Sequence, residues 1–395
     1  MKDYGFTDHG RRYVVRDVHA LDQADADLGN DTMRVHMDHR GRVIQAGFLQ
    51  PDMTGYSEAL RAFYVRDDVT GQFWSAPYEP VQAEPDQFTF SIGLADLQWT
   101  VVRDGLRIEL RLVIPRDDNA ELWTVTITNV SRRARRVSLY SYLPVGVAGL
   151  LAQHAWYDRA QRLAVHEYFP YYVHFPDLPK LRQLRNTVFC ASDVRPDSHE
   201  LSIAGFSGEH GLHNPDQLRS PRLRGTLARH EVANERTASI FQYRRALRPG
   251  QSFTVNLVFG PARDRAEALQ ISRRLLRADG VQRAVARAYR FLAQHAPQVR
   301  VTTPDVAFNH YLNHWQARRS LQLVRAQRYT LAPQGRNVIQ DAMGGVYTDP
   351  AASRQWFLRI WAHQHTNGWL PHGMPFAPDV RQQPINSIPH KDINS

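Results

Sequence analysis

The arrangement of apolar and polar residues along the first two thirds of the chain is typical of β-strands. From Tyr4 to about Pro261, apolar residues recur at every second position. In residues 106–114, for example, Leu or Ile occupies every even position, and charged residues occupy 107, 109 and 111. A period of two indicates strands with one buried face, and Asp104-Gly105 before this segment is a hairpin turn signal. Several such segments joined by short turns predict a large antiparallel β-sandwich.

Beyond residue 262 the apolar residues recur with the period of a helix. Positions 268, 271 and 275 fit one amphipathic helix, and positions 281, 285, 288 and 292 fit a second. Gly280 between them is predicted to cap the first helix. A third helix is expected to begin with Thr303 as its N-cap and Pro304 as its first residue, and another is predicted from about Pro350 to His365.

These patterns divide the chain into three predicted regions: a β-sandwich domain over 1–262, a helical linker over 263–300, and a helical domain over 301–395. The last region has room for about three or four helices, whereas a barrel of α-hairpins needs on the order of ten, each about 11–12 residues long. We therefore expect the chain to end inside its helical domain. The alternative, a compact helical cap, would leave several tryptophans without packing partners, namely Trp315, Trp356, Trp361 and Trp369.

Composition indicates the cellular compartment and argues against some kinds of partner. The only cysteine, Cys190, rules out an intramolecular disulfide. The N-terminus lacks the apolar stretch of a signal peptide, and no apolar run approaches the length of about 18 residues that a membrane span requires. We therefore expect a cytoplasmic protein without a membrane partner.

The net charge of +10 comes mainly from arginine. Its densest run, residues 132–136, lies between two alternating segments and is predicted to be a solvent-facing hairpin turn. No nucleic-acid-binding motif accompanies this run, so we expect no nucleic-acid partner.

Candidate chemistry is concentrated after residue 315. The sequence contains no HExxH, CxxC or EF-hand pattern and no GxSxG, Walker A or GxGxxG pattern, so we expect no metal and no cofactor. Five arginines follow Trp315 closely: Arg318, Arg319, Arg325, Arg328 and Arg336. Guanidinium groups suit phosphate or sugar hydroxyls, although a solvated helix face explains the same spacing equally well. Gln340 and Asp341 stand beside apolar residues, so at least one of them is expected to be partly buried and to need a polar partner.

Several short motifs follow one another along the chain: Tyr4-Gly5-Phe6 with Leu28-Gly29-Asn30, residues 64–75 (YVRDDVTGQFWS), residues 117–123 (DDNAELW) with 128–131 (TNVS), residues 206–209 (FSGE) and residues 336–341 (RNVIQD). In this order they resemble glycoside hydrolase family 94, a family of inverting glycoside phosphorylases. Each motif is weak alone, but together they extend over almost the whole chain. The resemblance implies a supersandwich, a helical linker and the first helices of an (α/α)6 barrel. It also implies a homodimer.

The resemblance also implies roles for particular residues. Arg325 matches a family arginine that helps to bind phosphate, and the donor sugar would be bound by Arg336, Asn337, Gln340 and Asp341. Asn337 stands where the family usually has Asp, so it keeps a hydrogen-bond acceptor but lacks the charge. Apart from the resemblance, His372 and His390 in predicted loops, and Asp392 close to the second, are candidate substrate contacts. The family's general acid, an Asp in a Trp-Asn-Asp-like motif, is expected beyond Ser395, so we assign no catalytic acid in this chain.

The function that these observations favour is inverting phosphorolysis of a β-linked disaccharide or oligosaccharide, with inorganic phosphate as co-substrate and an α-sugar 1-phosphate as product. Two alternatives stay open. One is an inverting glycoside hydrolase or transglycosylase on the same scaffold, which would need a second carboxylate as base. The other is a non-catalytic carbohydrate-binding protein that uses the aromatics of residues 168–175. The sequence does not identify the donor sugar, the acceptor sugar or the linkage.

Overall fold

The computed structural model describes residues 3–48, 60–146, 150–170, 187–223, 231–295, 299–326 and 335–370. Its strands are β1 Tyr4–Thr7, β2 Arg12–Val15, β3 Asp25–Gly29, β4 Met33–Asp38, β5 Val43–Phe48, β6 Ala62–Asp67, β7 Phe73–Ala76, β8 Gln87–Gly93, β9 Asp96–Arg103, β10 Leu106–Val113, β11 Glu121–Asn129, β12 Arg135–Val145, β13 Leu150–Asp158, β14 Leu163–Pro170, β15 Thr187–Ser192, β16 Ser198–Ser202, β17 Glu231–Ala233, β18 Thr237–Leu247 and β19 Ser252–Ala262. Its longer helices are α3 Arg265–Leu275, α4 Gly280–Gln294, α6 Ala317–Ala326, α7 Gly335–Gly345 and α8 Pro350–Trp361. Short helical turns are η1 Asp8–Gly10, α1 Ile203–Ser207, η4 Gly208–His210, η5 Asp216–Arg219, α5 Val306–His310 and the π-helical η6 Tyr311–Gln316.

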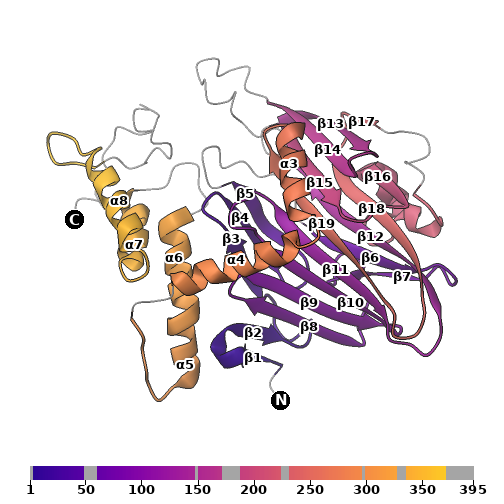
Figure 1. Ribbon diagram of the computed structural model, residues 1–395, viewed down its shortest axis with the longest axis horizontal. Coiled ribbons are helices and arrows are strands. Elements are labelled where there is room, and N and C mark those ends of the chain that lie inside the picture. Colours follow the sequence, from indigo (N-terminus) through magenta and orange to yellow (C-terminus); the bar gives the residue numbers. More distant parts are fainter. Residues whose placement is uncertain are drawn as a thin grey trace.

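The described strands form three antiparallel sheets (Figure 1). The largest has the order β1-β2-β8-β9-β10-β11-β19-β15-β14-β13-β17, the second has the order β16-β18-β12-β6-β7, and the third is β3-β4-β5. The alternation in residues 106–114 is confirmed, because Leu106, Ile108 and Leu110 are buried on β10 while the charged residues between them reach the surface. The turn from β9 to β10 is also as predicted, with positive φ at both Asp104 and Gly105.

The main core lies between the inner faces of these sheets and is rich in aromatic side chains. Trp99 on β9 stacks on Trp123 on β11, with 5.9 Å between ring centroids, and Phe90 on β8 stacks on Trp99 at 4.9 Å. All three rings are almost fully buried. Offset stacking of this kind adds stability beyond the apolar area that the rings bury.

The arginine-rich run at residues 132–136 is not the hairpin turn that its flanks predict. β11 belongs to the largest sheet and β12 to the second sheet, so the run connects two sheets. Arg135 is buried, and its Nη2 lies 2.7 Å from the carboxylate of Asp67 on β6. The prediction failed because alternation on both sides of a turn does not show whether the two strands pair with each other. Arg132, Arg133 and Arg136 are exposed, as expected.

Helices α3 and α4 lie along one face of the largest sheet (Figure 1). Ala268, Ile271 and Leu275 of α3 pack on apolar residues of β11, β14, β15 and β19, while Ala288 of α4 packs against Ala95 and Val113. The prediction that Gly280 caps α3 is wrong, because Gly280 is the first residue of α4. A Cβ at Gly280 would lie 2.3 Å from the Leu275 carbonyl oxygen, so the close approach of the two helix ends requires glycine there.

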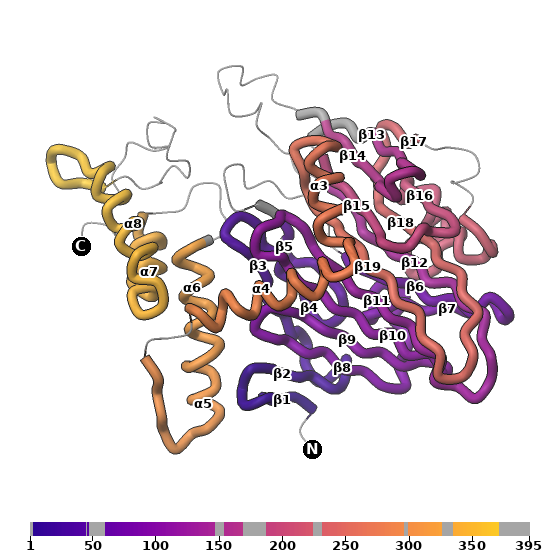
Figure 2. The backbone as a smooth tube through the Cα atoms, in the orientation of Figure 1, coloured from indigo at the N-terminus to yellow at the C-terminus, as the bar shows by residue number. Residues whose placement is uncertain are grey.

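The remaining helices form a separate group beside the sandwich. Figure 2 shows the α5–η6–α6 run between the sandwich on one side and α7 and α8 on the other. The predicted N-cap, Thr303, is wrong: Asp305 caps α5 by accepting from the Phe308 N–H, so the helix begins after Pro304. The helix predicted to reach His365 ends at Trp361.

Apolar side chains of this helical group are unevenly covered. Val338, Ile360 and Leu370 make a small core between α7 and α8, and the Trp356 Nε1–H donates to the Val324 carbonyl of α6. Trp361 and Trp369 are each about half exposed among the described residues. The predicted region boundary near residue 262 lies between the end of β19 and the start of α3, and the division into three domains stays a prediction.

Candidate functional site

Arg325, the predicted phosphate ligand, lies at the C-terminal end of α6 and is held by two carboxylates. Its Nε and Nη2 both donate to Asp31 in the β3–β4 turn at 3.2 Å, and its Nη1 donates to Asp349 at 2.5 Å. Asp349 also caps α8 by accepting from the Ala352 N–H. Burial alone would lower the pKa of Arg325, but these two ion pairs raise it above its ordinary value. The guanidinium is therefore permanently charged and fixed in orientation.

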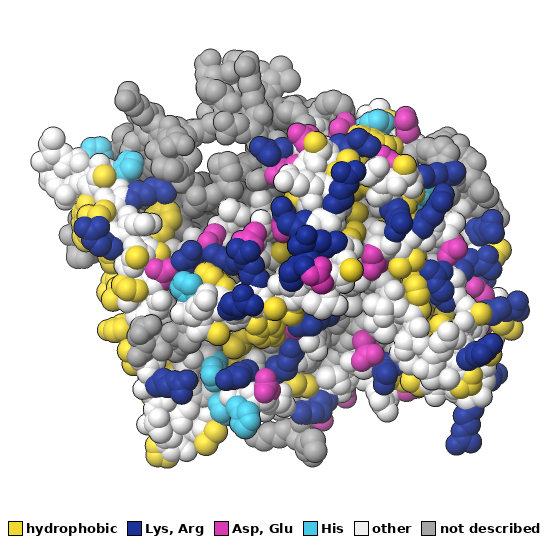
Figure 3. Space-filling model, in the orientation of Figure 1, with side chains coloured by type: hydrophobic (Ala, Val, Ile, Leu, Met, Phe, Trp, Pro, Cys, Tyr) yellow, Lys and Arg dark blue, Asp and Glu magenta, His cyan; other side chains and the backbone are white. Residues whose placement is uncertain are grey.

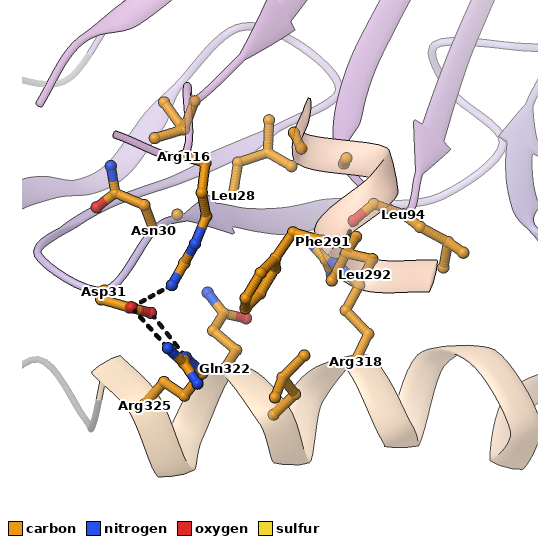
Figure 4. A pocket seen from close by; sticks show the side chains of 15 residues that line it. Leu28, Asn30, Asp31, Leu94, Arg116, Phe291, Leu292, Arg318, Gln322 and Arg325 are labelled. Atoms are coloured by element: carbon orange, nitrogen blue, oxygen red, sulfur yellow. Dashed lines mark hydrogen bonds and ion pairs between the residues drawn. The ribbon is translucent and has the colours of Figure 1, made fainter. Parts of the chain in front are cut away.

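A cavity of about 60 Å³ opens beside this guanidinium, between the sandwich, α4 and α6 (Figure 4). Arg116 from the sandwich shares the carboxylate of Asp31, and its guanidinium carbon lies 3.8 Å from the centre of the Phe291 ring. Arg325 faces the same ring at 5.3 Å. A water molecule needs roughly 10–15 Å³ by this measure, so the cavity holds a few waters or a small anion but not a disaccharide.

Two other arginines of the predicted cluster dock α6 on the sandwich. The Nε of Arg318 donates to the Leu94 carbonyl at 2.6 Å, and the Nη1 of Arg319 donates to the Asp27 carboxylate at 2.7 Å. Asp27 on β3 also pairs with Arg34 on β4. The sequence had left ligand binding and a solvated helix face equally open, and neither describes these two residues. Arg328 lies outside the described residues.

The predicted donor-sugar residues all lie on α7, in two i, i+4 pairs. Asn337 and Asp341 form one pair and Arg336 and Gln340 the other. Asp341 is buried with 8% of its surface exposed, whereas Gln340 is exposed, which confirms that at least one of these two polar groups is buried. Asp341 lies close enough to Arg319 to raise the pKa of that guanidinium, although burial and Arg34 lower it overall.

The other predicted sugar contacts either lie outside the described residues or are buried in the core. His372, His390 and Asp392 lie outside the described residues, as do Tyr171, Tyr172 and Phe175 of the predicted aromatic sugar contacts. Tyr168 is 1% exposed and belongs to the core, so it offers no face to a sugar. Within the described ranges, no three His, Cys, Asp or Glu side chains come together as a metal site would require.

Sequence reasoning missed the two carboxylates that hold Arg325. Asp31 is about 290 residues away along the chain, so no local pattern connects the two residues. Asp349 had a usable signal, because Asp349-Pro350 before an apolar helical segment is a helix start with Asp as N-cap and Pro as first residue. No sequence signal indicated its second role, which is the ion pair with Arg325.

Comparison with known proteins decides the family. The family model for the glycosyl hydrolase 94 supersandwich domain matches residues 56–278, more than half of the chain. The chain belongs to glycosyl hydrolase family 94. The predicted fold class is confirmed: an antiparallel supersandwich, linker helices and the start of an (α/α)6 barrel.

Among curated members, cellobionic acid phosphorylase of Neurospora crassa is 33% identical over 98% of this chain and 51% of its own length. The 3-O-beta-D-glucopyranosyl-beta-D-glucuronide phosphorylase of Paenibacillus borealis is 24% identical over 93% of this chain and 47% of its own. The chain thus spans about half the length of these relatives.

Two solved structures share the fold over most of this family 94 chain. One is described as a kojibiose phosphorylase from the human microbiome, with a TM-score of 0.55, 8% identity and coverage of 91% of this chain and 49% of that one. The other is a bacterial glucoamylase complexed with acarbose, with a TM-score of 0.52, 10% identity and coverage of 91% and 55%. Both superpositions extend past the sandwich into the helices. None of the described helices has both the length and the apolar character that a membrane span requires.

Proposed function

We propose that this chain is the phosphate- and donor-sugar-binding part of an inverting glycoside phosphorylase. The observation that carries the proposal is the family 94 match together with an arginine, Arg325, that is fixed and charged beside a cavity of small-anion size. In the proposed reaction, a carboxylic acid protonates the glycosidic oxygen while a phosphate oxygen attacks the anomeric carbon from the opposite face. The glycosidic C–O bond breaks, the acceptor leaves as an alcohol, and an α-sugar 1-phosphate forms.

Arg325 has the donors that this role needs. A guanidinium carries five N–H groups. Asp31 accepts one N–H from Nε and one from Nη2, and Asp349 accepts one from Nη1. One N–H on each terminal nitrogen is left for phosphate. Because the guanidinium is already fixed, phosphate binding would cost little ordering of this side chain. In the proposal, Arg336, Asn337, Gln340 and Asp341 hold the donor sugar, and the general acid belongs to a part of the barrel beyond Ser395.

The substrate class belongs to the same proposal. The names of two relatives, from Neurospora crassa and Paenibacillus borealis, specify substrates that carry a carboxylate: cellobionic acid and a glucuronide. We therefore propose a β-glucoside of a sugar acid as the substrate. We also propose a cytoplasmic homodimer that needs no metal or other cofactor and binds no nucleic acid or membrane.

The test is phosphate release from α-glucose 1-phosphate with gluconate, glucuronate, glucose or N-acetylglucosamine as acceptor. It is run with the 395-residue chain and with the longest reading frame that contains it. Release with gluconate or glucuronate supports the proposal and identifies the acceptor. Disaccharide cleavage at a rate that phosphate does not change would indicate a hydrolase instead, and sugar binding without turnover by either protein would indicate a binding protein.

The role of Arg325 is tested separately in whichever protein is active. Arg325→Gln should lower kcat/KM for phosphate by about a hundredfold, as does loss of one preorganised donor to a developing charge. Arg354, an exposed arginine on α8, provides the control, and Arg354→Gln should leave kcat/KM unchanged. Equal activity of both variants would remove Arg325 from the phosphate site.

A further inference from the structure

A second, larger cleft lies on the other side of Arg318, and arginine and histidine side chains dominate its polar lining. It measures about 630 Å³ and is bounded by η1, α4 and the η6–α6 run. Arg11, Arg290, Arg300, His295 and His314 line it, with Asp8 as the only acid among its lining residues. Figure 3 shows basic and histidine side chains gathered in this region, at the lower left of the view. Its volume is within the range of about 300–1,000 Å³ that is typical of small-molecule sites.

Three of these cations lack a counter-charge. Among the described residues, the guanidinium groups of Arg11, Arg290 and Arg300 make no ion pair or hydrogen bond, although all three are exposed enough to reach a ligand. Most other arginines near the helical group are paired, as Arg319 and Arg325 are. These basic side chains act on His314: burial and the neighbouring Arg11, His310 and Arg300 lower its pKa. An anion in the cleft would relieve this repulsion.

The segments that carry these cations are fixed to one another. Trp315 Nε1–H donates to the Gly10 carbonyl at 2.8 Å, which holds η1 and therefore Arg11 against η6. The side chain of Asn313 bonds both the N–H and the carbonyl of Val301, at 2.9 and 2.8 Å, which holds the backbone next to Arg300. These contacts hold the backbone segments that carry Arg11 and Arg300 against η6, so both arginines lie at the same cleft.

The α4 wall and the η6 wall have further features of a built site. The Tyr289 hydroxyl donates to the buried Asp96 at 2.5 Å, which fixes α4 beside Arg290. His314 and Asn313 lie on the π-helical turn η6, a rare irregularity that is frequent at functional sites. Arg12, Tyr289 and Arg318 also line the cleft, and its apolar lining includes Leu94, Leu292 and Leu321.

We propose that this cleft binds a small organic phosphate, with the phosphate group between Arg11, Arg290 and Arg300 and the organic part against the leucines. Guanidinium groups match phosphate oxygens in geometry and charge, and the cleft is too large for inorganic phosphate alone. The cleft adjoins the cavity at Arg325 and shares lining residues with it, among them Arg318. Arg325 does not line the cleft, and none of the three proposed phosphate ligands lines that cavity, so the inference does not depend on the proposed function.

The experiment measures binding of α-glucose 1-phosphate, adenosine monophosphate and inorganic phosphate to the 395-residue chain by calorimetry at low salt. One variant combines Arg11→Gln, Arg290→Gln and Arg300→Gln. Its control has the same change in net charge and combines Arg132→Gln, Arg133→Gln and Arg136→Gln. These three arginines are exposed near the connection from β11 to β12 and do not line the cleft. The cleft variant should bind the better organic phosphate at least about tenfold more weakly, because charge-assisted hydrogen bonds are lost, and the control should bind as the parent does.

A spectroscopic readout places the ligand. A phosphate bound in the cleft should raise the pKa of His314, measured by NMR of its ring, and Arg325→Lys should leave this shift unchanged. Equal weakening in the cleft variant and in the control would show general attraction of anions and overturn the site. Loss of the His314 shift in Arg325→Lys but not in the cleft variant, or no binding of any probe, would overturn it as well. A His314 shift that saturates at a lower concentration of inorganic phosphate than of either ester would overturn the assignment of an organic ligand.

Discussion

His166 on β14 is an ionisable side chain that the fold keeps uncharged. It is fully buried, and its Nδ1 and Nε2 lie 2.8 Å from the hydroxyl oxygens of Thr237 and Ser239 on β18. Burial lowers its pKa to about 3. Since β14 is in the largest sheet and β18 in the second sheet, this histidine links two sheets by neutral hydrogen bonds.

We predict that His166 makes the protein less stable as the pH falls. In the unfolded chain its pKa is about 6.5, so between that pH and about pH 3 only the unfolded state gains the proton, and unfolding is favoured. This residue should lower the free energy of unfolding by about 1.4 kcal/mol per pH unit below its unfolded pKa. Urea unfolding from neutral pH to about pH 5 should give a shallower decline for His166→Gln than for the parent. Parallel declines would contradict the prediction.

At the scale of elements, two adjacent glycines near the end of α7 have different surroundings. A Cβ at Gly345 would lie 2.6 Å from the side chain of Val324 on α6, whereas a Cβ at Gly344 would meet nothing closer than Ser320 Oγ at 3.7 Å. Gly345 is buried and Gly344 is exposed. α7 therefore approaches α6 closely at Gly345.

We predict opposite effects for the two alanine substitutions. Gly344→Ala should be neutral or should stabilise by up to about 1 kcal/mol, because alanine favours helix. Gly345→Ala should destabilise by about 1–3 kcal/mol, because the added methyl group overpacks the contact with α6. Thermal unfolding of the pair measures both. Similar unfolding temperatures for the two variants would mean that α6 and α7 do not pack as described.

Local patterns predicted the elements well and their neighbours poorly. The strand at residues 106–113 and the turn at Asp104-Gly105 depend on residues next to each other, and both are as the sequence predicts. The run at residues 132–136 and the partners of Arg318 and Arg325 depend on residues far apart in the chain. The family resemblance predicted phosphate at Arg325, and the structure adds that two carboxylates of this chain already pair with its guanidinium.

At the scale of the whole molecule, the buried carboxylate of Asp96 is one of the groups that tie the linker to the sandwich. Asp96 at the start of β9 is fully buried and accepts from Arg12 on β2 at 2.8 Å, Arg111 on β10 at 2.7 Å and Tyr289 on α4 at 2.5 Å. Burial and the nearby carboxylate raise the pKa of Tyr289 to about 12. Its hydroxyl therefore keeps its proton and remains a donor.

We predict that Asp96→Asn destabilises the protein by about 3–5 kcal/mol, because two arginines lose their counter-charge at a buried site. Tyr289→Phe keeps both ion pairs and should cost only about 0.5–1.5 kcal/mol, the value of one hydrogen bond. Denaturant unfolding of the two variants measures the difference. Equal losses would show that the carboxylate does not organise this junction.

The arginines of α6 have a consequence for recombining this chain with a relative. Arg319 and Arg325 find their carboxylates on the β3–β4 hairpin, about 290 residues earlier in the chain. A chimera that joins these helices to a foreign sandwich would bury guanidinium groups against whatever that hairpin supplies. Without acids at the places of Asp27 and Asp31, Arg319 would lose its carboxylate and Arg325 one of its two. Because these groups are partly exposed, each lost pair costs about 1 kcal/mol, out of the 5–15 kcal/mol that holds a typical domain together. A chimera should therefore take these helices and the β3–β4 hairpin from the same protein.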